Sequence, residues 1–213
     1  MLLDGIWKLS CPARNPSNLP ISIPGDVHTA LINSNIIPNP YYSTNENLIQ
    51  WVSDVEWIIE RTFTISNLSS FSAYLLSLEQ VDAISTVFIN HKEILNTTSA
   101  FIFYRTNIHE YLRDGENSIQ IIFRVAKKAA SERFFSTLPI TYPYSENNKV
   151  PFMNYLRLPQ FHSGWDWGPC IITSGILKSI KLIPFHKNEY DLIEVSTEQI
   201  YRNDKIDLKV DID

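Results

Sequence analysis

Six short segments rich in β-branched and aromatic residues recur along the 213-residue chain, and most of them are bounded by Asn, Asp, Ser, Gly or Pro. Such segments favour strands, and the turn residues between them favour antiparallel connections. The segments are Ile6 to Leu9, Val55 to Ile65, Phe71 to Leu78, Ile84 to Asn90, Ser118 to Val125 and Ile176 to Ile183. Because segments with a helical period are far fewer, the pattern predicts an all-β antiparallel sandwich, not a βαβ fold.

One or two short helices are expected within this sandwich. Asp26 precedes a segment from Val27 to Asn33 whose apolar residues recur at helical spacing, so Asp26 is the predicted N-cap. A second candidate runs from Ala126 to Phe135. It begins a long, proline-containing stretch that reaches Gln160, and loops of that length in compact domains are commonly functional or mobile.

Composition and charge narrow the function classes. The net charge of -5 argues against a nucleic-acid or anionic-membrane partner, and no apolar run approaches the roughly 20 residues of a membrane span. Cys11 and Cys170 form no CxxC pattern, which predicts reduced thiols and a cytoplasmic location. The alternative is a lysosomal or secreted protein whose signal was removed, because Asn67 and Asn96 begin glycosylation acceptor triplets. The five histidines show no HxH or HExxH spacing, so neither a metal site nor a cofactor is predicted.

The run from Gly164 to Pro169, GWDWGP, places one carboxylate between two indoles. Aromatic rings stack on the apolar faces of sugars, and a charged acceptor binds vicinal hydroxyls strongly. The competing interpretation is that the tryptophans are core and that Asp166 ties down backbone N–H groups. In an extended strand Trp165 and Trp167 would share a face without Asp166, but the flanking glycines relax that constraint.

Two long stretches resemble the N-terminal domain of β-mannosidases in glycoside hydrolase family 2. One is RLPQFHSGWDWGPCIITSGILKSIK, from Arg157 to Lys181, and the other runs from Ile23 to Phe63 and includes Trp51, Trp57 and the Asn45-Glu46 dipeptide. The resemblance implies a jelly-roll-like, galactose-binding-domain-like sandwich over residues 1–186. Residues 187–213 read as a linker and the truncated start of an immunoglobulin-like domain, with a (β/α)8 barrel expected to follow.

The resemblance also implies a function. The parent would be an exo-acting, retaining hydrolase of terminal non-reducing β-D-mannose residues, with both catalytic Glu residues in the barrel and an inactive fragment here. Retaining hydrolysis needs two carboxyl groups about 5 to 5.5 Å apart. The sequence offers no such pair, since Glu56 and Glu60 would stand about 13 Å apart on a strand, at a solvent edge.

The predicted substrate-binding residues are Trp165, Asp166, Trp167 and His162. The resemblance places Asp166 and Trp165 at the barrel mouth, on hydroxyls of the terminal mannose. His162 is open to three interpretations: a sugar contact, a bond to Asp166, or a structural loop contact. Arg157 either pairs with Asp166 or holds loop backbone.

The alternatives to a hydrolase fragment are an autonomous carbohydrate-binding module and a purely structural spacer. Trp7, Trp51 and Trp57 are predicted core or packing residues.

Overall fold

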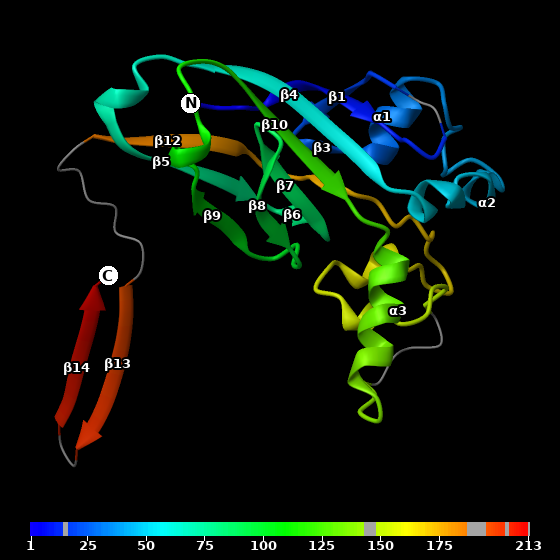
Figure 1. Cartoon of the computed structure of the whole chain (residues 1–213). Helices are drawn as coiled ribbons and strands as arrows, with labels where there is room; N and C mark the ends of the chain where they lie inside the picture. The colour runs from blue at the N-terminus through cyan, green and yellow to red at the C-terminus, as the bar shows by residue number, and fades with distance from the viewer. Residues whose placement is uncertain (15–16, 143–147, 187–194, 203–204, 213) are drawn as a thin grey trace.

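The structure is a computed structural model that describes residues 1–14, 17–142, 148–186, 195–202 and 205–212 (Figure 1). Its larger sheet has six strands in the order β2-β1-β4-β10-β7-β8. These strands are β1 (Gly5–Ser10), β2 (Leu19–Ile23), β4 (Trp57–Ile65), β7 (Ser85–Ile89), β8 (Lys92–Thr97) and β10 (Gly115–Phe123). Every neighbouring pair in this sheet is antiparallel.

A second sheet has three strands in the order β12-β5-β9 (Figure 1). Its strands are β5 (Phe71–Glu79), β9 (Phe103–Asn107) and β12 (Ile180–His186). A third, short sheet joins β3 (Gly25–Asp26), β11 (Gly175–Ile176) and β6 (Val81–Asp82). The antiparallel sandwich predicted from the sequence is therefore confirmed.

Within the described residues three α-helices accompany the sheets: α1 (Val27–Asn33), α2 (Asn45–Leu48) and α3 (Ala126–Thr137). Two of them, α1 and α3, were predicted, and α2 was not. The side chain of Asp26 accepts the N–H of Thr29 at 3.0 Å, so the predicted cap of α1 is confirmed. Short 3-10 helices lie between the main elements: η1 (Gln50–Asp54), η2 (Leu68–Ser70), η3 (His109–Tyr111), η4 (Met153–Tyr155) and η5 (Gln160–His162).

The main core lies between the two larger sheets and follows the alternation of their strands. Ile59 of β4 is in register with Ile121 of β10, which is in register with Val87 of β7, and all three side chains are fully buried. Trp7 and Trp57 are buried, and each indole N–H donates to a backbone carbonyl at 2.8 Å. The predicted core role of these tryptophans is confirmed, and Trp51 packs half-buried against the same cluster.

Some sequence-based boundaries are wrong. The predicted strand from Ile176 to Ile183 is two strands, because β11 ends at Ile176 and β12 begins at Ile180. Glu60 lies on β4, which is flanked by β1 and β10, so this residue is on the face of an interior strand and not at a sheet edge. Glu56 precedes that strand. A single segment cannot show which strands will pair on either side of it.

A smaller hydrophobic cluster, here called the satellite core, forms where α3 packs on the segment that leads to the GWDWGP run (Figure 1). Its buried members are Ala83, Ala100, Ala126, Ala130, Met153, Leu156, Leu158, Cys170 and Ile172. At its rim the ring of Phe134 stacks on that of Phe152 with centroids 4.2 Å apart. The long stretch after α3 is thus anchored on the helix.

The final described segment is a hairpin of β13 (Val195–Arg202) and β14 (Lys205–Ile212), which pair with each other in antiparallel register. Its apolar side chains include exposed Tyr201, Ile206 and Leu208. The predicted linker and domain start begin at residue 187, and residues 187–194 lie outside the described residues, so the division into domains stays a prediction.

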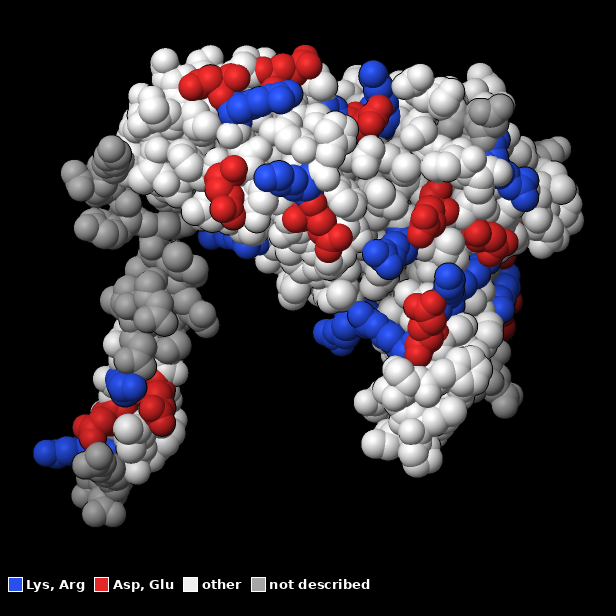
Figure 2. Space-filling view, viewed as in Figure 1, with Lys and Arg blue, Asp and Glu red and all other residues white. Residues whose placement is uncertain are grey.

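The distribution of surface charge and the length of the helices can be compared with the partners that the sequence argued against. Lys and Arg side chains are interspersed with Asp and Glu on the face shown in Figure 2. Over the described residues, no helix is long and apolar enough to cross a membrane.

Candidate functional site

The GWDWGP run forms a turn that is closed at its base by an antiparallel bridge between Ser163 and Cys170. Gly164 has φ +79°, and a Cβ there would lie 2.9 Å from Cδ of Lys149 and 3.0 Å from Cβ of Cys170. Both the dihedral and the close packing require glycine at this position. The predicted need for backbone freedom beside Trp165 is thereby met at Gly164.

Trp165 and Trp167 line a pocket of about 590 Å3 between the turn and helix α1. Phe161 and Tyr41 contribute further aromatic surface, and His162 is also in the lining. Of the four predicted substrate-binding residues, three therefore meet around one pocket. A concave, largely aromatic site with a few polar groups is the usual form of a small-molecule site.

Asp166 is the fourth predicted residue, and it lies outside the lining of this pocket. Its side chain is exposed and makes no hydrogen bond or ion pair with the described part of the chain. Trp167 beside it is 84% exposed, although large aromatic side chains are normally mostly buried. The turn therefore presents one carboxylate and one indole to the solvent.

His162 contacts a buried acid that the sequence analysis did not identify. Its Nδ1 lies 3.4 Å from Oδ2 of Asp82, without the geometry of a hydrogen bond, and neither atom has another partner within the described residues. Asp82 is only 1% exposed. Burial raises the pKa of the Asp82 carboxyl to about 7, with a further contribution from the charge of Asp26, and burial lowers the pKa of His162.

Of the three interpretations of His162, the structure thus shows a contact with a buried strand residue and none with Asp166. No local signal in the sequence points to Asp82, because 80 residues separate it from His162 in the chain. The short sheet brings it there: Gly175 of β11 is in register with Asp26 on one side and with Asp82 on the other.

A second buried histidine, His28 of α1, lies in the pocket lining within a polar chain. Oγ1 of Thr173 is 3.0 Å from Nδ1 of His28 and donates to Oδ1 of Asp26, also at 3.0 Å. Since that hydroxyl has one proton and the carboxylate only accepts, Nδ1 of a neutral His28 must carry the proton, which leaves Nε2 as an acceptor. Burial lowers the pKa of His28 to about 4, against the effect of Asp26, so the ring is neutral above about pH 5.

Arg157 does not pair with Asp166. Its carbonyl accepts the N–H of Ala100 at 2.7 Å, and its guanidinium lies 5.6 Å from the ring centroid of Phe101. The structure thus shows a backbone contact of Arg157 and a side-chain contact with Phe101, and it shows no guanidinium bond to loop backbone among the described residues. Among the described residues, no group of three or more His, Cys, Asp and Glu side chains is placed to hold a metal ion.

The antiparallel sheets and the few short helices place the chain in the class of β-sandwich domains. Residues 7–178 match the family model described as the glycosyl hydrolase 2 galactose-binding domain-like domain, and the chain belongs to this family. The resemblance to family 2 glycoside hydrolases predicted from the two sequence stretches is confirmed.

Curated relatives include a probable β-mannosidase of Caenorhabditis elegans, 29% identical over 195 residues, which are 88% of this chain and 21% of the relative. The β-mannosidase of Mus musculus is 30% identical over 90% of this chain and 22% of its own length. This chain therefore spans about a fifth of the length of these relatives.

Solved structures give the same picture. A β-D-mannosidase from Dictyoglomus thermophilum matches all of this chain and 25% of its own, with a TM-score of 0.79 and 28% identity. A β-glucuronidase from an uncultured Clostridium species matches with a TM-score of 0.59 at 15% identity, a likeness that extends to the fold alone.

Proposed function

We propose that this domain contributes terminal-sugar contacts to a β-mannosidase-like exo-glycosidase, a retaining hydrolase of terminal non-reducing β-D-mannose residues. Asp166 would accept hydrogen bonds from sugar hydroxyls, and Trp165 and Trp167 would supply apolar surface for the ring. The observation that carries this proposal is the exposed carboxylate of Asp166, which has no partner among the described residues and lies on a turn with a fixed base.

That observation favours the sugar-binding interpretation of the motif over the structural one. An aspartate that serves the fold would accept backbone N–H groups, as Asp26 does at the start of α1. Asp166 accepts none within the described residues. The simplest role for Asp166 is therefore to bind a group from outside this chain, and a sugar hydroxyl is a donor that its carboxylate can accept.

Asp26 lies in the pocket lining, and Asp82 lies against His162 of that lining. Asp82 is buried, and Asp26 accepts from the backbone and hydroxyl of Thr29 and from Thr173. Neither is free to act as nucleophile or acid/base, so the pair needed for retaining hydrolysis would come from a barrel domain of the same protein. We expect this chain alone to be inactive and to function beside immunoglobulin-like and (β/α)8 barrel domains. Its cytoplasmic location stays a prediction.

The test is the Asp166→Ala variant in a full-length protein that carries this domain. Loss of a charged contact made in the transition state costs about 2 to 4 kcal/mol, or roughly 30- to 900-fold in kcat/KM. Hydrolysis of an aryl β-mannoside measures it. Asp166→Asn keeps the shape and an acceptor while removing the charge, and it should fall between wild type and Asp166→Ala. Wild-type kinetics in both variants would reduce the turn to a scaffold.

The alternative, an autonomous carbohydrate-binding module, is favoured by one observation: aromatic residues of this chain line a pocket of about 590 Å3. Calorimetric titration of the chain with mannose and with a β-mannobioside separates the two functions. Half of a subsite lacks most of its contacts and should show no measurable binding, whereas a module should bind with a Kd below about 1 mM.

A further inference from the structure

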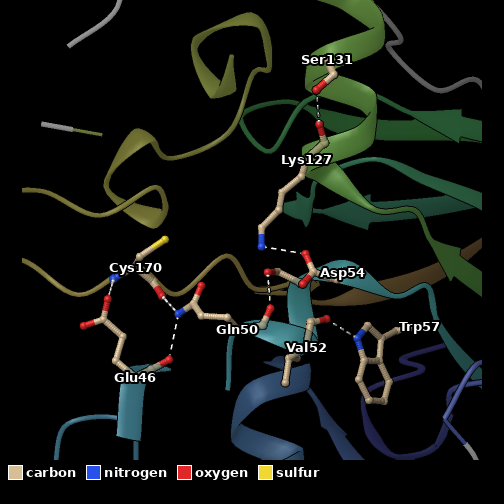
Figure 3. Close-up of polar contacts among 9 residues, drawn as sticks. Glu46, Gln50, Val52, Asp54, Trp57, Lys127, Ser131 and Cys170 are labelled. Atoms are coloured by element: carbon tan, nitrogen blue, oxygen red, sulfur yellow. Dashed lines mark hydrogen bonds and ion pairs between the residues drawn. The ribbon is translucent and has the colours of Figure 1, made fainter. Parts of the chain in front are cut away.

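The base of the GWDWGP turn is held by a residue of α2, more than a hundred positions earlier in the chain. Oε1 of Glu46 accepts the backbone N–H of Cys170 at 2.7 Å (Figure 3). The same oxygen accepts from Nζ of Lys149 at 2.9 Å. Nε2 of Gln50 donates to the carbonyls of Glu46 and Cys170, each at 2.9 Å. Both backbone polar groups of Cys170 thus bond to this clamp of Glu46, Gln50 and Lys149.

The clamp matters because the turn has little hydrogen bonding of its own. Within the turn, the N–H of Trp165 reaches the carbonyl of Gly168 at 3.4 Å, which is long for such a bond. Pro169 has no N–H to give. The orientation of the two indoles and of Asp166 therefore depends on how the base of the turn is fixed.

Lys149 holds the other arm of the turn. Its backbone N–H donates to the carbonyl of Ser163 at 2.8 Å, and its aliphatic stem packs directly over Gly164. The ion pair with Glu46 then connects the arm that enters the turn with the arm that leaves it. A backbone N–H bonded to a carboxylate makes a stronger contact than one bonded to a neutral acceptor.

The protonation state of Glu46 agrees with this geometry. Burial of the carboxylate acts to raise its pKa, but the hydrogen bond from Cys170 and the ammonium of Lys149 outweigh burial and leave the pKa lowered. Glu46 is therefore ionised under neutral conditions, as the clamp requires.

We propose that Glu46 is a positioning residue, which fixes the orientation of Trp165, Asp166 and Trp167 by holding the base of their turn. Its catalytic consequence rests on the proposed function above. Its structural consequence does not, because the orientation of the indoles is observable without any substrate. A Glu46 that merely stabilised the fold would lower stability and leave the indoles where they are.

The first experiment uses this chain labelled with 5-fluorotryptophan, which gives one 19F resonance for each of its five tryptophans. Single Trp→Phe variants assign Trp165 and Trp167. In Glu46→Ala both resonances should shift or broaden, while buried Trp7 keeps its position. Glu46→Gln retains an acceptor for the N–H of Cys170 and should give a smaller change.

The structure offers a matched control in the same region. Asp54 pairs with Nζ of Lys127 at 2.8 Å and ties η1 to α3 without touching the turn (Figure 3). Asp54→Asn removes an ion pair of similar length and should leave the resonances of Trp165 and Trp167 unchanged. If Glu46→Gln and Glu46→Ala leave those two resonances as in wild type, the proposal is overturned.

The second experiment measures aryl β-mannoside hydrolysis by the full-length protein. Glu46→Ala should lower kcat/KM about tenfold, Glu46→Gln less, and Asp54→Asn not at all. Because Glu46 acts through the turn that carries Asp166, adding Glu46→Ala to Asp166→Ala should cost less than the product of the two separate losses. Fully multiplicative losses would contradict positioning. Altered resonances together with normal kinetics in Asp166→Ala would support positioning and overturn the proposed function instead.

Discussion

Asp82 makes the stability of this domain depend on pH in a way that one substitution isolates. Its carboxyl is 1% exposed, has no hydrogen-bond partner among the described residues, and has a pKa raised from 3.8 to about 7. The folded state therefore binds a proton at Asp82 that the unfolded state has released between pH 4 and pH 7. This contribution to stability is fully present below pH 3.8 and is lost as the pH rises through 7.

The magnitude follows from the shift. A shift of about three units, at about 1.4 kcal/mol per unit, corresponds to a loss of about 4 kcal/mol between pH 4 and pH 8. Asp82→Asn cannot ionise, so the free energy of unfolding of this variant should rise relative to wild type over the same interval. The unpartnered amide adds a constant offset that does not change with pH.

Urea unfolding followed by tryptophan fluorescence at pH 4, 5, 6, 7 and 8 measures the difference between variant and wild type at each pH. Comparison at one pH cancels the titration of other groups that the two proteins share. Asp82→Ala removes the same proton with a different packing cost, so it should give a parallel line at another offset. A difference that stays flat within about 1 kcal/mol from pH 4 to pH 8 would refute the assigned burial of this carboxyl.

Two further substitutions test the surroundings of the short sheet and the pocket. The pKa of His28 is lowered from 6.5 to about 4, so the stability that its neutral ring contributes is present above pH 6.5 and is lost as the pH falls to 4. Wild type should therefore lose up to about 3 kcal/mol more unfolding free energy than His28→Gln between pH 7 and pH 4, measured by urea unfolding. In Gly175→Ala the new Cβ would lie 2.3 Å from the carbonyl oxygen of Gly25, which should cost about 2 to 3 kcal/mol of unfolding free energy. Gly115→Ala is its control, since Gly115 has φ +92° and open space around it, and backbone strain alone should cost about 1 kcal/mol. Equal losses at both glycines would contradict the close approach of the strands at Gly175.

The sequence predicted those parts of the fold whose signal is local. Strand β4 alternates buried residues with half-buried or exposed ones except at Arg61, and α1 has both its cap and its apolar stripe in adjacent residues. Strands β2 and β8 were among those not predicted. The second residue of β2, LPISI, is a proline, and β8, KEILNT, carries charged and amide side chains, so neither has a clear strand pattern. These strands form through pairing with β1 and β7, so tertiary context decided their state.

In the candidate site, too, the residues predicted from the sequence are those whose signal is local. The GWDWGP run could be found because its chemistry lies in six adjacent residues, and the structure brings Trp165, Trp167 and His162 around one pocket. Asp82 and His28 could not be found, because neither has a partner nearby in sequence. Thr173, which bonds to His28, is 145 residues away from it. Asp26 was recognised as a helix cap, but its bond to Thr173 exists only once β3 pairs with β11.

Because of the satellite core, the local stability of the site can differ from the stability of the sandwich. The segment before the turn rests on α3 and on residues such as Met153 and Leu156, whereas Ile59 and Ile121 belong to the main cluster between the sheets. Local opening breaks only the contacts of the unit that opens, so the satellite core can open while the sheets stay paired. The fraction of molecules able to bind then depends on the free energy of opening of the satellite core. A chain that is folded by every global measure can still spend part of its time with the turn released.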